Sequence, residues 1–233
     1  MTVSTQSLPK AVQVSEMLIR EIAAGRLVDG ARLPTERQMA RDLGIAVGTL
    51  RRALAILEEK GLLTRVQGSG NYVRSRRDIQ SVYSFFRLEK VEGGGLPSAE
   101  VLEVLRLRKT KEMPDIGKSE WAHRIRRLRF LGGDPVAFEE IWLDFRFCDR
   151  LNANDLNESL YLHYKDKLGL IISHVTDRIG VSTLPDWPNV SLNMQTGSPC
   201  GYVERIGKDQ DGMDAEYSRT WFDQTTARYT VRR

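Results

Sequence analysis

Three segments near the amino terminus repeat apolar residues every three or four positions, which is the spacing of one face of a helix. They predict helices at residues 10–24, 35–43 and 47–60. The apolar stripes consist of Val14, Leu18, Ile22, Met39, Ala40, Leu43, Val47, Leu50, Leu54 and Leu57. A glycine follows each segment directly, where helices commonly end. The beginning of the chain is therefore predicted to be a small unit of three helices.

The second helix begins with a capping signal, and the third is followed by a hairpin signal. Thr35 precedes Gln38 by three residues, as in a capping box, where each side chain binds a backbone amide at the helix start. Two β-prone runs at residues 62–66 and 71–73 flank the turn Gln67-Gly68-Ser69-Gly70. Two helices joined by a tight turn and followed by a hairpin form a winged helix-turn-helix, whose second helix enters the DNA major groove.

The rest of the chain has a different pattern. Short β-prone runs dominate it, with one helical segment at residues 157–168 and a turn at residues 209–213. The runs lie at residues 100–107, 125–131, 136–143, 171–181, 200–208 and 215–222. Many strands with a single helix predict an α+β domain with a mainly antiparallel sheet.

A boundary separates the two patterns. Three consecutive glycines, Gly93-Gly94-Gly95, cannot hold a stable helix or strand. The apolar residues Val82, Phe85, Phe86 and Leu88 before them are expected to pack on one domain or on a partner subunit. The sequence thus predicts a DNA-binding domain at residues 1–75, a linker at 76–95 and a second domain at 96–233.

Composition excludes several classes of protein. The 41% hydrophobic and 28% charged residues are ordinary for a soluble globular protein. No apolar run is long enough to cross a bilayer, and no signal segment opens the chain, so we expect a cytoplasmic protein without a membrane partner. Cys148 and Cys200 lack metal-type spacing, so neither a metal site nor a disulfide scaffold is predicted.

The net charge of +4 is unevenly distributed. Residues 1–77 hold 13 Lys and Arg against 7 Asp and Glu, whereas the remainder holds 22 against 24. Positive charge is therefore concentrated in the predicted helix-turn-helix, as binding to a polyanion requires.

The order LPTERQMARDLGI, TLRRALAILEEKGLL and QGSGNYV resembles the DNA-binding domain of GntR-family transcription regulators. The resemblance covers residues 10–73. It implies binding to double-stranded DNA, and arginine suits both guanine edges and phosphates. One departure is Ala46-Val47-Gly48, where relatives usually have Ser-Arg and a frequent threonine, so the third helix lacks its cap hydroxyl. The DNA-binding residues implied are Arg37, Thr49, Arg51, Arg52, Arg65 and Gly68.

The second domain, from about residue 96 to 231, resembles the UTRA ligand-sensing domain of the histidine-utilisation-repressor branch, which shares a fold with chorismate lyase. The resemblance rests on the order of RLR at residues 127–129, GDPVA at 133–137, SLY at 159–161 and EYSR at 216–219. It implies a small polar or anionic effector. Pro97 and Ser98 are expected in a loop that binds an anion. The effector-binding residues implied are Pro97, Ser98, Arg127, Arg129, Glu139, Arg146, Ser159, Tyr161, Glu216 and Phe222.

The residues themselves support such a site. Arg127 and Arg129 are two positions apart, so in a strand they point to one face of a sheet. They repel each other unless a carboxylate or a bound anion lies between them. Glu139 and Glu216 could hold them without ligand, and a ligand anion could replace these carboxylates. A structural ion-pair network without a ligand is the alternative.

These expectations combine into a dimeric, effector-responsive transcription regulator that reads an inverted repeat. The family resemblance implies that it is a repressor. A second hypothesis is a ligand-independent DNA-binding protein whose second domain only dimerises. A third is a lyase-like enzyme, but fold analogy is a weak warrant for function. Since the sequence has no recognisable nucleophile–base pair, it predicts neither enzymatic activity nor a cofactor.

Overall fold

The structure is a computed structural model that describes residues 8–23, 25–75, 85–93, 95–156, 158–188, 192 and 194–231. The chain divides into two compact units, which are described separately. The smaller runs chiefly from Leu8 to Arg87, and the larger from Leu88 to Tyr229. No helix of the described residues is long and apolar enough to cross a membrane.

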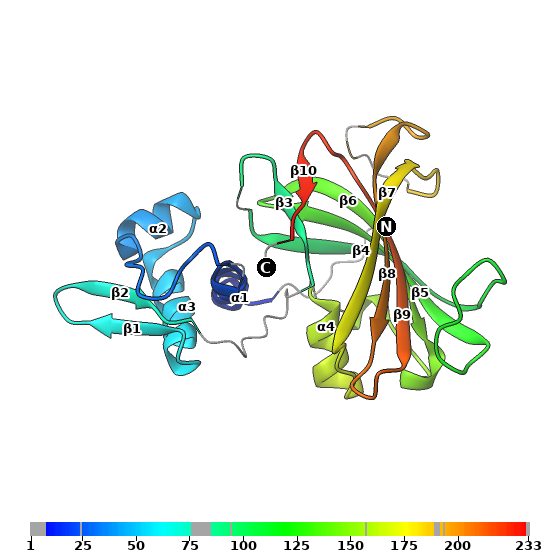
Figure 1. The fold of residues 1–233 in the computed structure, drawn as a ribbon, viewed down its shortest axis with the longest axis horizontal. Coiled ribbons are helices and arrows are strands. Elements are labelled where there is room, and N and C mark those ends of the chain that lie inside the picture. Colours follow the sequence, from blue (N-terminus) through cyan, green and yellow to red (C-terminus); the bar gives the residue numbers. More distant parts are fainter. Residues whose placement is uncertain are drawn as a thin grey trace. The chain divides into compact units, whose positions relative to one another are not determined.

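The smaller unit contains the three predicted helices and the hairpin (Figure 1). They are α1 (Lys10–Ala23), α2 (Glu36–Asp42), α3 (Val47–Glu59), β1 (Leu63–Val66) and β2 (Gly70–Val73). Eight of the ten predicted stripe residues are buried in its core, whereas Leu43 and Val47 are half-buried. The fully buried members are Val14, Leu50, Leu54 and Leu57. Burial of these aliphatic side chains contributes roughly 1.5–3 kcal/mol each.

The helix ends follow the local sequence, with one difference. The Thr35 hydroxyl accepts a hydrogen bond from the Gln38 amide at 3.3 Å, so it caps α2. The Gln38 side chain instead donates to Asp42 at 2.8 Å, so the reciprocal bond of a capping box is replaced by one along the helix. Ala46 caps α3 without a side-chain bond, and Gly61 ends the helical segment at a φ of 69°.

The larger unit is built on a six-stranded antiparallel sheet in the order β4-β5-β6-β9-β8-β7 (Figure 1). The α+β prediction with a mainly antiparallel sheet is confirmed. The strands are β4 (Pro97–Arg108), β5 (Trp121–Leu131), β6 (Asp134–Asp144), β7 (His174–Thr183), β8 (Pro199–Lys208) and β9 (Asp214–Phe222). Short helical turns lie at η1 (Phe145–Phe147) and η2 (Ala153–Asp155).

Different parts of the chain pack on the two faces of the sheet. On one face lie α4 (Leu160–His163) and the π-helical η3 (Tyr164–Leu168), which together form the predicted helix from residue 160 onwards. Residue 157 lies outside the described part. On the other face, two apolar clusters are centred on Trp221 and Trp142, and the segments after β4 and β7 contribute Ile116 and Leu184 to them.

Part of the predicted linker belongs to the larger unit. Leu88–Lys90 form β3, which pairs antiparallel with β10 (Ala227–Tyr229). Residues 76–84 and 94 lie outside the described part. The linker predicted at 76–95 is thus too long at its carboxyl end, because the apolar Leu88 is buried in a strand.

Candidate functional sites

The first candidate site is the arginine-bearing surface of α2, α3 and the hairpin. Arg37 on α2 and both Arg51 and Arg52 on α3 are exposed, while Thr49 is half-buried. On the hairpin, Arg65 and the turn residue Gly68 are exposed. All six residues implied by the family resemblance therefore lie in one small unit, and five have exposed side chains or backbone.

Ion pairs orient two of these arginines. Arg51 Nε lies 2.6 Å from Glu36 Oε2, which joins α3 to the start of α2. Arg65 Nε lies 3.9 Å from Glu58 Oε2. Because both pairs are exposed to solvent, each contributes little to stability. Their guanidinium groups can therefore exchange a carboxylate for a phosphate or base edge at small cost.

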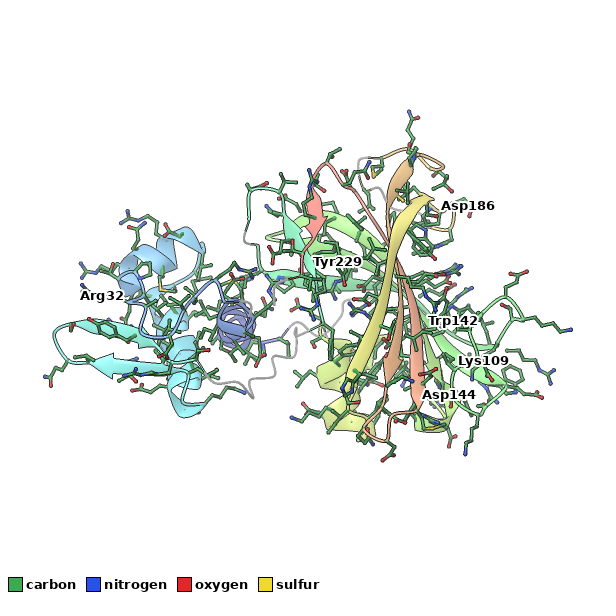
Figure 2. The ribbon with its side chains drawn as sticks, viewed as in Figure 1. Arg32, Lys109, Trp142, Asp144, Asp186 and Tyr229 are labelled. Carbon is green, nitrogen blue, oxygen red and sulfur yellow. The ribbon has the colours of Figure 1, made fainter. Side chains whose placement is uncertain are left out.

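Sequence reasoning missed Arg32 in this unit. Arg32 forms an isolated bridge with Tyr72 of β2, and a Cβ added at Gly70 would lie 3.3 Å from its Nε. Its exposed side chain thus lies along the hairpin (Figure 2). Only the pairing of residue 32 with β2 reveals this position, and no local pattern around the Gly30 turn predicts it.

The second candidate site is a buried charged cluster on the face of the sheet that α4 covers. Arg127 and Arg129 of β5 are 5% and 3% exposed, so both point inward as their spacing predicts. Arg127 lies directly opposite Glu139 of β6, and its Nη2 donates to Glu139 Oε2 at 2.6 Å. Arg129 Nε is 3.9 Å from the same oxygen.

The same two arginines also hold the segment before α4. Nη1 of Arg127 and Nη1 of Arg129 donate to the main-chain carbonyl of Glu158 at 3.3 and 3.2 Å. The next residue, Ser159, caps α4 by accepting a hydrogen bond from the Leu162 amide at 3.3 Å. The start of α4 is thus attached directly to the arginines of β5.

The cluster continues to Tyr161 and Glu216. The Tyr161 hydroxyl donates to Glu216 Oε1 at 2.9 Å. Burial raises the pKa of Glu216, and this effect outweighs the hydrogen bond from Tyr161 and the charge of Arg205. Burial also acts to raise the pKa of Glu139, but the charges of Arg127 and Arg129 lower it below its usual value. The pKa values of the two carboxyl groups are therefore shifted in opposite directions.

Three further residues that contact one another beside the cluster were not predicted. Arg205 of β8 forms a two-point ion pair with Asp177 of β7, with Nε–Oδ1 and Nη2–Oδ2 distances of 2.6 and 2.8 Å. The Tyr229 hydroxyl also donates to Asp177 (Figure 2 labels Tyr229). Arg205 lies two residues after Val203 on a predicted strand, so both side chains point to one face of the sheet, and that spacing was the available signal.

The structure corrects the position of Pro97 and Ser98. They were expected in an anion-binding loop, but they begin β4 and pair with Leu131 and Phe130 of β5. Pro97 has no amide hydrogen to offer an anion. The strand begins here because Gly95, at a φ of 89°, packs closely on Leu131 and ends the preceding turn.

Two other expected effector residues lie apart from the arginine–carboxylate contacts. Arg146 Nη2 pairs with Asp209 Oδ2 at 2.6 Å, and its Nε lies 3.8 Å from Asp144 Oδ1, so its partners are the end of β6 and the β8–β9 turn. Phe222 is buried, and its ring lies over Gly201, where a Cβ would approach within 2.3 Å. Phe222 therefore contributes an apolar wall to this face.

The raised pKa of Glu216 gives a prediction about stability. The pKa of Glu216 is higher in the folded than in the unfolded chain, so its protonation stabilises the fold. This stabilisation is complete at pH values below the ordinary pKa of 4.5, and it is lost as the pH rises through the pKa of the folded protein. Glu216→Gln keeps an oxygen for Tyr161 without the charge. We expect it to raise the thermal midpoint by a few degrees at pH 8 and less at pH 5. Differential scanning calorimetry measures this, and equal shifts at both pH values would contradict it.

In the part of the chain that the structure describes, no three His, Cys, Asp or Glu side chains gather in a way that could hold a metal ion. The buried cluster offers guanidinium, carboxyl and phenol groups. These groups bind and orient polar molecules through charge-assisted hydrogen bonds.

Comparison with known proteins identifies a matching family model for each of the two units. Residues 10–73 match the family model for bacterial regulatory proteins of the gntR family, and residues 92–228 match the UTRA domain. The HTH-type transcriptional regulator SmoD of Agrobacterium fabrum is 55% identical over 97% of both chains. The mannosyl-D-glycerate transport/metabolism system repressor MngR of Escherichia coli is 28% identical over 94% of this chain and 93% of its own.

A solved structure agrees with the fold. The possible transcriptional regulator YydK from Bacillus subtilis superposes with a TM-score of 0.55 at 22% identity, covering 97% of this chain and all of that one. The two family models match the helix-turn-helix unit and the antiparallel-sheet unit separately. The chain therefore belongs to the gntR family of bacterial regulatory proteins, as a DNA-binding transcription regulator with a carboxyl-terminal UTRA domain.

Proposed function

We propose that this protein is a cytoplasmic homodimeric repressor that leaves an inverted-repeat operator when a small polar or anionic metabolite binds its UTRA domain. The observation that carries the proposal is the presence in one chain of an exposed arginine surface and a buried arginine–carboxylate cluster. The first suits a polyanion, and the second suits a small charged ligand.

At the operator, α3 would lie in the major groove, with Arg51 and Arg52 facing base edges and phosphates. Arg37 would contact the backbone from α2, and the hairpin would bring Arg65 and Gly68 beside the duplex. Two copies related by a two-fold axis would read two half-sites. Without the usual cap hydroxyl at Ala46, the start of α3 offers its free backbone amides to a phosphate.

At the sensor, an anionic group of the effector would compete with Glu139 for Arg127 and Arg129. Tyr161, Glu216 and the newly recognised Arg205 would hydrogen-bond the hydroxyl groups of a polar metabolite. This division suits a ligand with one anionic end and several hydroxyls. MngR is named for mannosyl-D-glycerate, a sugar that carries a carboxylate, and we propose an effector of the same chemical class here.

The link from binding to release would begin at the Glu158 carbonyl. In the structure, Arg127 and Arg129 both donate to this carbonyl. An anion that takes these donors would free the segment that leads into α4, and that movement would be passed on to the DNA-binding unit. A coupling free energy of about 1–3 kcal/mol, or a 5–150-fold change in operator affinity, is typical of such linkage.

The test is a fluorescence-anisotropy titration of the protein with DNA from upstream of its own gene, without and with candidate metabolites. We expect saturable binding that falls steeply with salt, and release by an anionic sugar derivative that also raises the thermal midpoint. Binding with no response to any metabolite would favour the ligand-independent dimer. Chemical turnover of a metabolite, followed by mass spectrometry, would favour the enzyme.

A further inference from the structure

The six-stranded sheet ends in β7, whose outer edge is open in the part of the chain that the structure describes. This ten-residue strand is mostly exposed, and its centre carries two β-branched apolar side chains. Ile179 is 59% exposed and Val181 80%, the largest value among the exposed large hydrophobic side chains of the described residues. A long open edge with exposed apolar residues is a template for pairing with another strand.

The opposite edge strand of the sheet, β4, has features that discourage pairing with another strand, and β7 lacks them. On β4, a register shift lies between Val101 and Glu103, and bulges of this kind discourage edge pairing. The second half of β4 also carries charged side chains at Glu103, Arg106 and Arg108. On β7, the register with β8 is continuous from His174 to Thr183, and residues 179–183 carry no charge.

We propose that β7 of one protomer pairs antiparallel with β7 of a second copy, around a two-fold axis through Gly180. This rests on the proposed dimer and names its interface. The pairing would join two six-stranded sheets into one continuous sheet. Ile179 of each copy would lie opposite Val181 of the other, so that four exposed apolar side chains meet in two cross-strand pairs.

Geometry and charge select this register. A two-fold axis perpendicular to the sheet keeps each face on its own side, so it must pass through a residue position rather than between two. An axis at Arg178 would put two like charges directly opposite each other, which is unfavourable. An axis at Ile179 would set Asp177 against Val181. The axis at Gly180 places Arg178 opposite Ser182 and Asp177 opposite Thr183, without a charge conflict.

The interface would border the sensor cluster. Asp177 lies two residues from Ile179 on the same strand and face, and it holds Arg205 through two hydrogen bonds. Movement of Arg205 toward an effector would therefore act on the strand that joins the protomers. The dimer interface and the effector site would share β7.

A cysteine at the axis tests the register. Opposite residues in antiparallel strands have Cα atoms about 4.5–5.5 Å apart, within the range of a disulfide. A Cβ at Gly180 meets nothing within 4 Å, and the backbone there lies outside the left-handed region. We expect Gly180→Cys, in a Cys148→Ser background, to give a disulfide-linked dimer on a non-reducing gel. Arg178→Cys is the matched control, since its two copies would lie four residues out of register.

A second variant keeps the test decisive if the cysteine disturbs folding. We expect the double variant Ile179→Lys, Val181→Lys to sediment as a monomer at micromolar concentration, while Thr176→Lys, on the exposed end of the strand, stays dimeric. A double variant that remains dimeric, together with no cross-link at residue 180, would overturn the interface. If the wild type still binds and releases its operator, the proposed function would survive that failure. A wild-type monomer would instead remove both the dimer and its interface.

Discussion

Replacing Arg127 by methionine is expected to lower the free energy of unfolding by about 3–5 kcal/mol, because it leaves the buried Glu139 carboxylate without its nearest partner. Arg127 is 5% exposed and its Nη2 lies 2.6 Å from Glu139 Oε2. The second cation, Arg129, is 3.9 Å from that oxygen and cannot replace a direct hydrogen bond. Urea denaturation followed by circular dichroism measures the change.

The control for this prediction lies on the same strand. Arg124 pairs with the half-exposed Glu103 at 2.7 Å on the other face of the sheet, so Arg124→Met should cost less than about 1 kcal/mol. Adding Glu139→Gln to the Arg127→Met variant should recover part of the loss, since it removes the unpaired charge. Equal effects of the Arg127 and Arg124 variants would show that burial of Glu139 does not decide the outcome.

The second large effect concerns DNA. Arg51→Ala is expected to weaken operator binding by about 1–3 kcal/mol, or 5–150-fold, if its guanidinium contacts a base edge. Arg65→Ala should weaken binding to all sequences alike and reduce the salt slope by about 1, as the loss of one phosphate contact does. Fluorescence-anisotropy titrations at several salt concentrations, with operator and with scrambled DNA, separate the two results.

An arginine outside the smaller unit serves as the matched control for charge. Arg150, which follows η1, is exposed and loses the same single charge on replacement by alanine. An Arg150→Ala variant that weakened operator binding as much as Arg51→Ala would mean that overall charge, rather than the α3 surface, determines affinity. Glu36→Gln, which releases Arg51 from its 2.6 Å ion pair, should leave binding equal or stronger.

Local patterns predicted the elements well, because they depend on neighbours along the chain. The apolar stripe from Val14 to Leu57 became the core of the smaller unit, and Gly61 adopts the left-handed conformation that ends a helix. The two-residue spacing of Arg127 and Arg129 was enough to place both on one buried face. These features are set by the periods of helices and strands, which the residues themselves display.

Which side chains and strands contact one another was decided by the register between segments that are distant in the sequence. Asp177 finds Arg205 across β7 and β8, 28 residues apart, and Pro97 joins a strand because Leu131 of β5 lies opposite it. Gln38 bonds to Asp42 rather than to the helix start, and Leu88 enters a strand by pairing near the carboxyl terminus.

The sequence by itself determined the two kinds of unit, the arginine-rich α3 and the inward direction of the β5 arginines. Only the tertiary structure decided which carboxyl group each buried arginine meets, that Arg205 belongs to the cluster, and that no described strand pairs with the outer edge of β7. The physical reason is that periodicity is a property of one segment, whereas a buried ion pair requires two segments whose relative register is fixed by the whole sheet.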